Sequence, residues 1–141
     1  MNYEVSKALP AKPLLTCPWC GARLEDARIA RKTDAVYICP GCGQMTNYSD
    51  IASAPSLYDA LPEATRMRLT DWAKERFAPA EGNAANTEDT YVLKHRYQVL
   101  TDTYLYSGCL NGALLHLGFR PRDTLKTNWT FDMRWKKPGL A

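Results

Sequence analysis

Four of the five cysteines in this 141-residue chain occur as two pairs with the spacing of metal ligands. The pairs stand in the segments Cys-Pro-Trp-Cys-Gly and Cys-Pro-Gly-Cys-Gly, with eighteen residues between them. Two residues between thiolates let one tight turn present both sulfurs to a single ion, and two such pairs about 15–20 residues apart are typical of a tetrathiolate zinc site. The pattern predicts one Zn²⁺ per chain, bound by Cys17, Cys20, Cys39 and Cys42.

The residues around each pair favour the same site. Pro18 and Pro40 fix φ directly after the first cysteine of each pair, which stiffens the turn. Gly21 and Gly43 follow the second cysteine, where the chain must turn with positive φ while backbone N–H groups approach sulfur. Four protein thiolates leave no open coordination position, so we expect the zinc to be structural.

Three other uses of the cysteines fit less well. A thioredoxin-like redox centre needs one pair beside a βαβ pattern, and this chain has two matched pairs instead. Two disulfides are disfavoured in a reducing compartment. Iron in a rubredoxin-like site is a further alternative, although such proteins usually space their pairs more widely.

Residues 14–50 resemble the zinc-ribbon family, in which two cysteine turns lie at the ends of a small antiparallel sheet. Residues 23–30 and 34–39 are candidate strands on either side of a polar turn at 31–33, and residues 44–48 could add a third. The resemblance implies metal binding. It implies little about function, because ribbons occur in transcription factors, ribosomal proteins, enzymes and inhibitors alike.

The remaining sequence predicts an α+β fold: a flexible arm at 1–13, the zinc ribbon at 14–50, and a helical domain with a terminal strand at 51–141. Residues 49–55 are interpreted as a small-residue linker, and Ser56 and Asp59 as a weak capping pair before a short turn. Helices are predicted at about 62–77, from directly after residue 86 or 87 to about 100, and from Ser107 as N-cap to Gly118.

For two of these elements, the sequence also predicts how they pack. In the second helix the expected buried residues are Tyr91, Val92, His95 and Val99. From Trp129 the apolar period becomes two, which predicts a strand that joins the sheet of the ribbon or pairs with a partner.

Residues 90–134 loosely resemble small uncharacterised phage and plasmid proteins. The shared elements are a Tyr-x-Leu-Lys-His helix, a helix led by Asn-Gly that ends in Gly-Phe, and a following strand. This chain departs from that pattern at residues 107–110. The resemblance implies no activity and favours an origin in a phage or other mobile element.

Composition excludes several classes of protein. Hydrophobic residues make up 45% and charged residues 23%, which is ordinary globular usage, and the net charge is only +3. The sequence shows neither an apolar run that could cross a bilayer nor a secretory signal, so we expect a cytoplasmic protein with no membrane partner.

No catalytic motif stands out. His95 and His116 are the only histidines. His95 is expected to be a packed or solvent-facing helix residue, and His116 is seven residues from Cys109 on a helix, too far to share one metal with it. Cys109 is expected to be a buried apolar residue. The combination of cysteine pairs with histidines is also found in HNH nucleases, but there the pairs bracket the active site, whereas here both precede it. We therefore expect no enzyme and no small-molecule substrate, with an HNH-like nuclease as a remote alternative.

Two binding functions fit the sequence. The first is contact with nucleic acid or a nucleic-acid-handling complex. Trp19 and the basic residues near the C-terminus would hold it, namely Arg120, Arg122, Lys126, Arg134, Lys136 and Lys137. Trp129, Phe131 and Trp135 would stack bases in this reading, or face the core if the strand is simply amphipathic. The second is an inhibitor or adaptor that docks on a host machine, such as a CRISPR–Cas defence complex or RNA polymerase.

Overall fold

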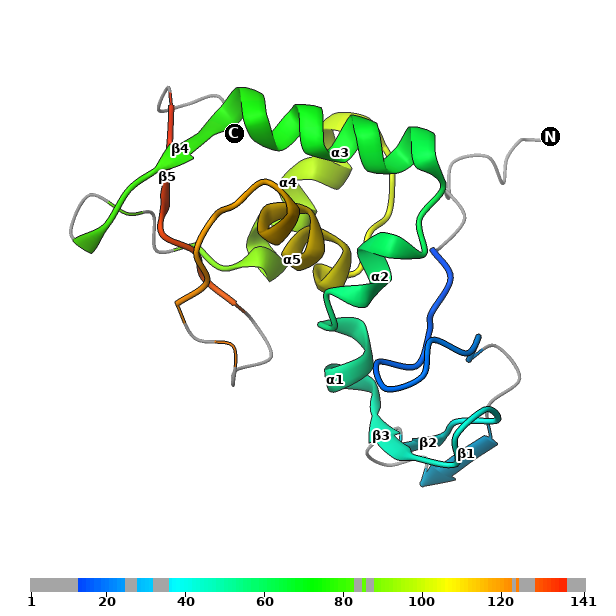
Figure 1. Ribbon diagram of the computed structural model, residues 1–141. Coiled ribbons are helices and arrows are strands. Elements are labelled where there is room, and N and C mark those ends of the chain that lie inside the picture. The colour runs from blue at the N-terminus through cyan, green and yellow to red at the C-terminus, as the bar shows by residue number, and fades with distance from the viewer. Residues whose placement is uncertain are drawn as a thin grey trace, which may run out of the picture.

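A computed structural model describes residues 13–24, 28–31, 36–82, 85, 88–122, 124 and 129–136. The predicted arm at 1–13 lies outside this part of the chain except for its last residue. Lys126 and Lys137 lie outside it as well. Helices and small antiparallel sheets make up the described part, which confirms the α+β class (Figure 1).

The first sheet contains three antiparallel strands in chain order: β1 (Arg28–Arg31), β2 (Val36–Ile38) and β3 (Met45–Asn47). All three were predicted, although each is shorter than its sequence pattern. The second cysteine pair forms the turn between β2 and β3, closed by Cys39 N–H donating to Gln44 O at 3.0 Å. The first pair lies in a separate turn, flanked by an antiparallel bridge between Thr16 and Arg23.

Two short helices follow the sheet: α1 (Tyr48–Ala52) and α2 (Ser56–Asp59). The prediction of a linker at 49–55 was therefore wrong. Asn47 caps α1, because its side-chain oxygen accepts from the N–H of Asp50 at 2.9 Å. Ile51 is fully buried, so α1 is anchored by packing despite its small and polar composition.

The longer elements agree with the predicted helices in number and order. They are α3 (Glu63–Arg76), α4 (Thr90–Thr101) and α5 (Ser107–His116). Asp89 caps α4 by accepting from Val92 N–H at 3.0 Å, so the helix starts two or three residues later than predicted. After α5, Gly118 has φ of +91°, as predicted for the residue that ends the helix.

Helix α5 is the centre of the helical part, with α2, α3 and α4 packed around it (Figure 1). Every residue from Ser107 to Leu114 is buried. Two glycines allow the closest approach: a Cβ at Gly108 would lie 2.3 Å from Ala54 O, and one at Gly112 would lie 2.3 Å from Pro55 O. The glycine spacing of four places both on the face that meets α1 and α2.

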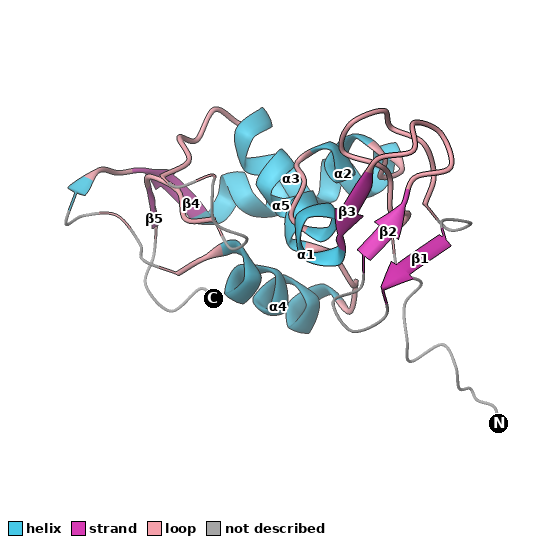
Figure 2. Ribbon diagram, turned by 90° about the horizontal axis from the view of Figure 1, so that it is seen from below, coloured by secondary structure: helices cyan, strands magenta, loops and turns pink. Residues whose placement is uncertain are grey.

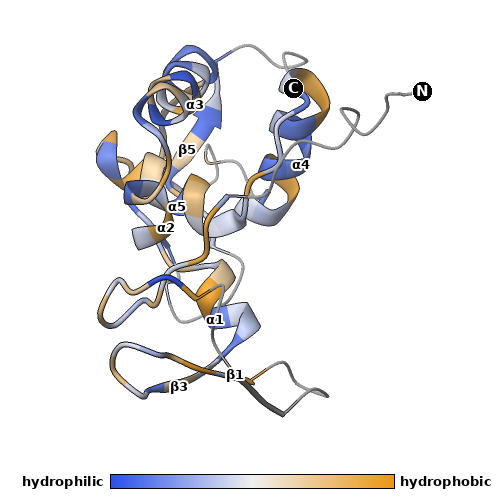
Figure 3. Ribbon diagram, turned by 90° about the vertical axis from the view of Figure 1, so that its right-hand side faces the viewer, coloured by the Kyte–Doolittle hydropathy of each residue, from blue (hydrophilic) through white to orange (hydrophobic). Residues whose placement is uncertain are grey.

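The predicted buried face of α4 was wrong. Tyr91, Val92, His95 and Val99 are exposed, and the buried residues are Thr90, Leu93, Lys94 and Tyr97. The Tyr97 ring packs edge-on against Trp72 of α3 with 5.2 Å between centroids, which turns the other apolar side of the helix outward. Bands of hydrophobic residues therefore appear on α4 without all belonging to the core (Figure 3).

The terminal strand pairs with a partner that the sequence did not predict. β5 (Met133–Trp135) runs antiparallel to β4 (Phe77–Pro79), which directly follows α3. The predicted pairing with the ribbon was wrong, because this two-stranded sheet lies at the opposite end of the helical part (Figures 1 and 2). Trp129, Phe131 and Met133 are buried in the helical core, so these side chains face inward and are not available to stack bases.

The buried residues form a large and a small cluster. The large one lies among the helices and β4–β5, and the small one consists of Cys17, Leu24, Cys39 and Ile51 beside the first sheet. Leu15 packs against both. A domain boundary at residue 50 stays a prediction. None of the described helices is long and apolar enough to cross a membrane.

Candidate metal centre

The four paired cysteines converge at one point, as predicted. Their sulfur atoms all lie within 4.8 Å of one another, although the two pairs come from separate turns. Sγ of Cys17 lies 3.8 Å from Sγ of Cys42, and Sγ of Cys20 lies 3.6 Å from that of Cys39. A tetrahedral ion with bonds of about 2.3 Å requires sulfur–sulfur edges of about 3.8 Å. The residues therefore fit one tetrahedrally coordinated ion.

Backbone N–H groups also point at the sulfurs. Trp19 N–H donates to Cys17 Sγ at 3.4 Å, and Gly41 N–H donates to Cys39 Sγ at 3.3 Å. Such N–H groups stabilise the negative charge of thiolate ligands. Gly21 and Gly43 have φ of +80° and +78°, which confirms the predicted left-handed residue after each pair.

The two turns meet closely at Gly41. A Cβ at this position would lie 2.8 Å from the Cβ of Ala22 and 3.2 Å from Sγ of Cys20. Gly41 therefore lets the second turn approach the first until all four sulfurs can share an ion.

The thiols have unequal acidity. The backbone N–H of Cys42, followed by that of Gly41, lowers the pKa of Cys39 to about 6. For Cys20, the N–H of Ala22 lowers the pKa, but the hydrogen bond with Cys39 and burial outweigh it and raise the pKa to about 12. Metal binding requires deprotonated thiols, so the affinity of the four cysteines for a cation should fall as the pH is lowered.

The metal-binding end of the molecule has little apolar core of its own. Two of the four residues in its buried cluster, Cys17 and Cys39, are themselves candidate ligands, while Cys20 and Cys42 are exposed. So small a cluster contributes only a few kcal/mol by burial. A bound ion would therefore supply much of the stability of this part, as expected for a structural site.

Trp19 lies beside the metal centre with its ring in solvent. Its side chain is 65% exposed, and its Nε1–H donates to Oγ1 of Thr46 in β3 at 3.1 Å. Met45, on the same strand, is equally exposed. The hydrogen bond orients the indole ring, so the first turn presents an aromatic surface that is held in place.

The predicted basic residues do not join Trp19. Arg120, Arg122, Arg134 and Lys136 are exposed near β4 and β5, at the other end of the molecule. Arg122 binds Asp132 at 2.7 Å and Gly82 O at 3.1 Å. Lys136 Nζ donates to Lys74 O in the last turn of α3 at 2.7 Å. Two of the four therefore hold the fold together, and the predicted residues form two separate surfaces.

Within the described residues, no second group of three or more metal-ligating side chains exists. Cys109 is fully buried in α5 outside the cysteine cluster, and burial raises its pKa to about 12. His95 is exposed and its ring contacts Tyr91, while His116 contacts Tyr58.

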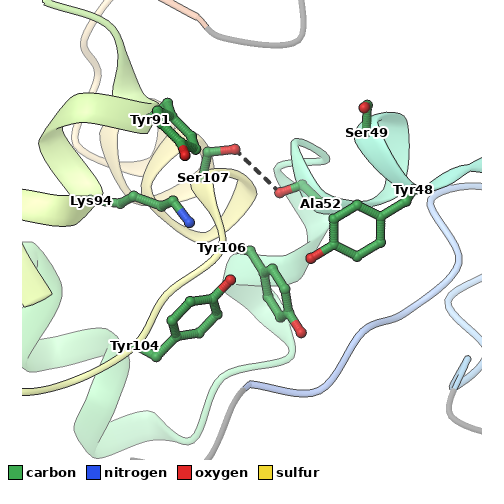
Figure 4. A pocket seen from close by; sticks show the side chains of 8 residues that line it. All are labelled: Tyr48, Ser49, Ala52, Tyr91, Lys94, Tyr104, Tyr106 and Ser107. Atoms are coloured by element: carbon green, nitrogen blue, oxygen red, sulfur yellow. Dashed lines mark hydrogen bonds between the residues drawn. The ribbon is translucent and has the colours of Figure 1, made fainter. Parts of the chain in front are cut away.

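Sequence reasoning missed a pocket between α1, α4 and the residues that lead into α5 (Figure 4). Its lining includes Lys94 and four tyrosines, Tyr48, Tyr91, Tyr104 and Tyr106. Tyr91 and Lys94 belong to the Tyr-x-Leu-Lys-His segment. Residues three apart on a helix lie on the same side of it, and this spacing was the one feature of the sequence that could have indicated the pocket.

The chain matches no protein-family profile, and neither a curated protein nor a solved structure shows significant similarity to it.

Proposed function

We propose that this protein is a non-catalytic zinc-ribbon protein that binds single-stranded nucleic acid, alone or within a nucleic-acid-handling complex. The zinc would be structural, held by the four clustered cysteines. The origin in a phage or other mobile element is part of this proposal and rests on the sequence resemblance alone.

The observation that carries the proposal is the exposed and oriented ring of Trp19. An indole that is 65% exposed, yet fixed by a 3.1 Å hydrogen bond to Thr46, is suited to stack on a flat partner. Nucleobases all offer such a face, and base–aromatic stacking contributes about 1–3 kcal/mol per base. The metal centre would keep this surface rigid.

Binding of a labelled oligothymidylate, followed by fluorescence anisotropy over a range of salt concentrations, tests the proposal. Trp19→Ala should weaken binding about 5- to 150-fold, Trp19→Phe should lose less, and the metal content of both should equal that of wild type. Met67→Ala, on the exposed side of α3, is the matched control. Equal affinity of Trp19→Ala and wild type would contradict a stacking role.

A specific observation also favours a second function, docking on another protein. The outer face of α4 exposes Val92, Val99 and Leu100 along a shallow groove of about 360 Å³ that also includes Tyr91, His95 and Arg96. Exposed apolar surface of this kind is typical of protein interfaces. An adaptor or inhibitor could use it to bind a host complex.

The dependence of binding affinity on salt concentration distinguishes the two functions. Contacts with phosphate weaken steeply as salt rises, whereas an apolar interface does not. Val99→Asp should abolish protein docking and leave oligonucleotide binding unchanged, because Val99 is 84% exposed and lies on α4, whereas Trp19 lies in the first cysteine turn.

A further inference from the structure

The four clustered cysteines differ in their access to solvent. Cys20 and Cys42 are exposed, whereas Cys17 and Cys39 are buried. Each turn therefore has one sulfur that a small reagent in solution reaches directly and one that the protein covers. Thiolates, the form in which cysteines bind a metal, are also the form that peroxides oxidise. The exposed sulfur of each turn is thus the point at which an oxidant reacts first.

Beside each exposed sulfur lies a buried sulfur of the other turn. Sγ of Cys20 lies 3.6 Å from Sγ of Cys39. Sγ of Cys42 lies 3.8 Å from Sγ of Cys17. Two sulfurs in a disulfide lie about 2.0 Å apart, so each pair has to approach by a further distance of about 1.6–1.8 Å. The close contact of the turns at Gly41 therefore places an exposed cysteine next to a buried partner twice.

We propose that a peroxide converts the metal centre into two disulfides between the turns, one joining Cys20 to Cys39 and one joining Cys17 to Cys42. In each pair the exposed thiolate attacks one oxygen of the peroxide, which leaves a sulfenic acid and releases hydroxide. The buried thiolate then attacks the sulfenic sulfur, the S–S bond forms, and a second hydroxide leaves. Each sulfur loses one electron and one molecule of peroxide is reduced per disulfide.

Oxidation removes the negative charges that hold a cation, so a bound ion is released. This release rests on the structural metal of the proposed function, whereas the pairing of the cysteines rests on the positions of their sulfurs alone.

Disulfides between the turns would keep the metal-binding end closed. A bond between Cys20 and Cys39 closes a loop that contains eighteen other residues, whereas a bond within one turn closes a loop that contains two. The longer loop restricts the unfolded chain more, so a bond between the turns stabilises the folded form more. Cys17 and Cys39 would also stay in the small buried cluster with Leu24 and Ile51. The oxidised chain therefore keeps the packing of this end without a metal.

Treatment of the full, metal-loaded chain with hydrogen peroxide, at two molecules per chain, tests the proposal. A zinc indicator should report release of the metal, and mass spectrometry of the intact chain should report the loss of one hydrogen from each of the four thiols. Trypsin cleaves after Arg23 and Lys32, so the two cysteine pairs fall on separate peptides, which should stay linked until a dithiol reductant is added. Chymotryptic cleavage after Trp19, with fragmentation between Cys39 and Cys42, then identifies the partners.

Cys109→Ala is the matched control, because this fifth cysteine is fully buried in α5, and it should give the same products as wild type. The oxidised chain should keep the NMR signals of the first sheet, whereas a chain stripped of metal by a chelator in the presence of reductant should lose most of them. Unlinked tryptic peptides, a different pairing of the four cysteines, or loss of the sheet signals on oxidation would overturn the proposal. Strand binding at Trp19 is measured on the reduced, metal-loaded chain, so its failure leaves the pairing of the cysteines untouched.

Discussion

Gly41→Ala probes how closely the two cysteine turns must approach to bind an ion. The added Cβ would lie 2.8 Å from the Cβ of Ala22 and 3.2 Å from Sγ of Cys20. The first distance is far below van der Waals contact, so the second turn must move outward. Overpacking of this kind typically costs about 1–3 kcal/mol. Because the strain is present only when the four sulfurs are together, it should weaken metal binding about 5- to 150-fold.

Competition with a chromophoric zinc chelator measures this affinity, and Co²⁺ absorption reports whether four thiolates still coordinate. The decisive comparison is the double variant Gly41→Ala, Ala22→Gly, which removes the Cβ at the closest contact and should recover most of the lost affinity. Ala22→Gly alone should bind nearly as wild type does. Unchanged affinity in Gly41→Ala would refute the close approach, and a loss that Ala22→Gly does not relieve would refute its assignment to this contact.

The remaining predictions concern metal stoichiometry, packing and pH. Cys109→Ala should keep one metal per chain, measured by metal analysis, and lower stability by on the order of 1 kcal/mol through lost packing. Gly112→Ala should lower the melting temperature although alanine favours helices by about 1 kcal/mol, because its Cβ would meet Pro55 O and the Tyr58 side chain; a rise would contradict the packing of α5. Deleting residues 127–141 should unfold the helical part, seen by circular dichroism, and leave metal binding intact, because the small buried cluster contains no residue of this segment. Acidification should release the metal cooperatively, since protons compete for thiolate ligands, and the release can be followed with a zinc indicator.

The candidate metal centre could be predicted from the sequence because each half of it is local. One turn of five residues determines the position of two sulfurs, the backbone N–H groups that approach them, and the glycine with positive φ. Only the contact between the two turns at Gly41 depends on residues distant in sequence. The repeated motif already implied that the two turns lie close together, because it predicted that both pairs bind one ion. The helices α3 and α5 were predictable for a similar reason, since the apolar period and the glycine that ends α5 are properties of the segment. The predicted N-cap Ser107 was wrong, because Ser107 is the first residue of α5 and Tyr106 precedes it.

The features that the sequence did not predict depend on tertiary packing. Helix α4 is apolar on more than one side, so its period alone does not identify the face that Tyr97 turns toward Trp72. The strand at 133–135 needed a partner, and that partner, Phe77–Pro79, reads in sequence as the end of a helix followed by a proline-containing loop. From its type alone, Lys94 would be expected to face solvent, because Tyr104 and most of the other residues that line its pocket come from other segments.

The segment that the sequence marked as a linker is the structural connection between the metal centre and the pocket. On one side, Ile51 of α1 completes the buried cluster that contains Cys17 and Cys39. On the other, Ala52 O accepts from Ser107 Oγ at 3.4 Å, and Ser53 O accepts from the buried Asn111 Nδ2 at 2.9 Å. Tyr48 and Ser49, on the same helix, line the pocket. An ion bound by the four cysteines would stabilise the packing around Ile51, and through α1 it would support the wall of the pocket that Tyr48 and Ser49 form.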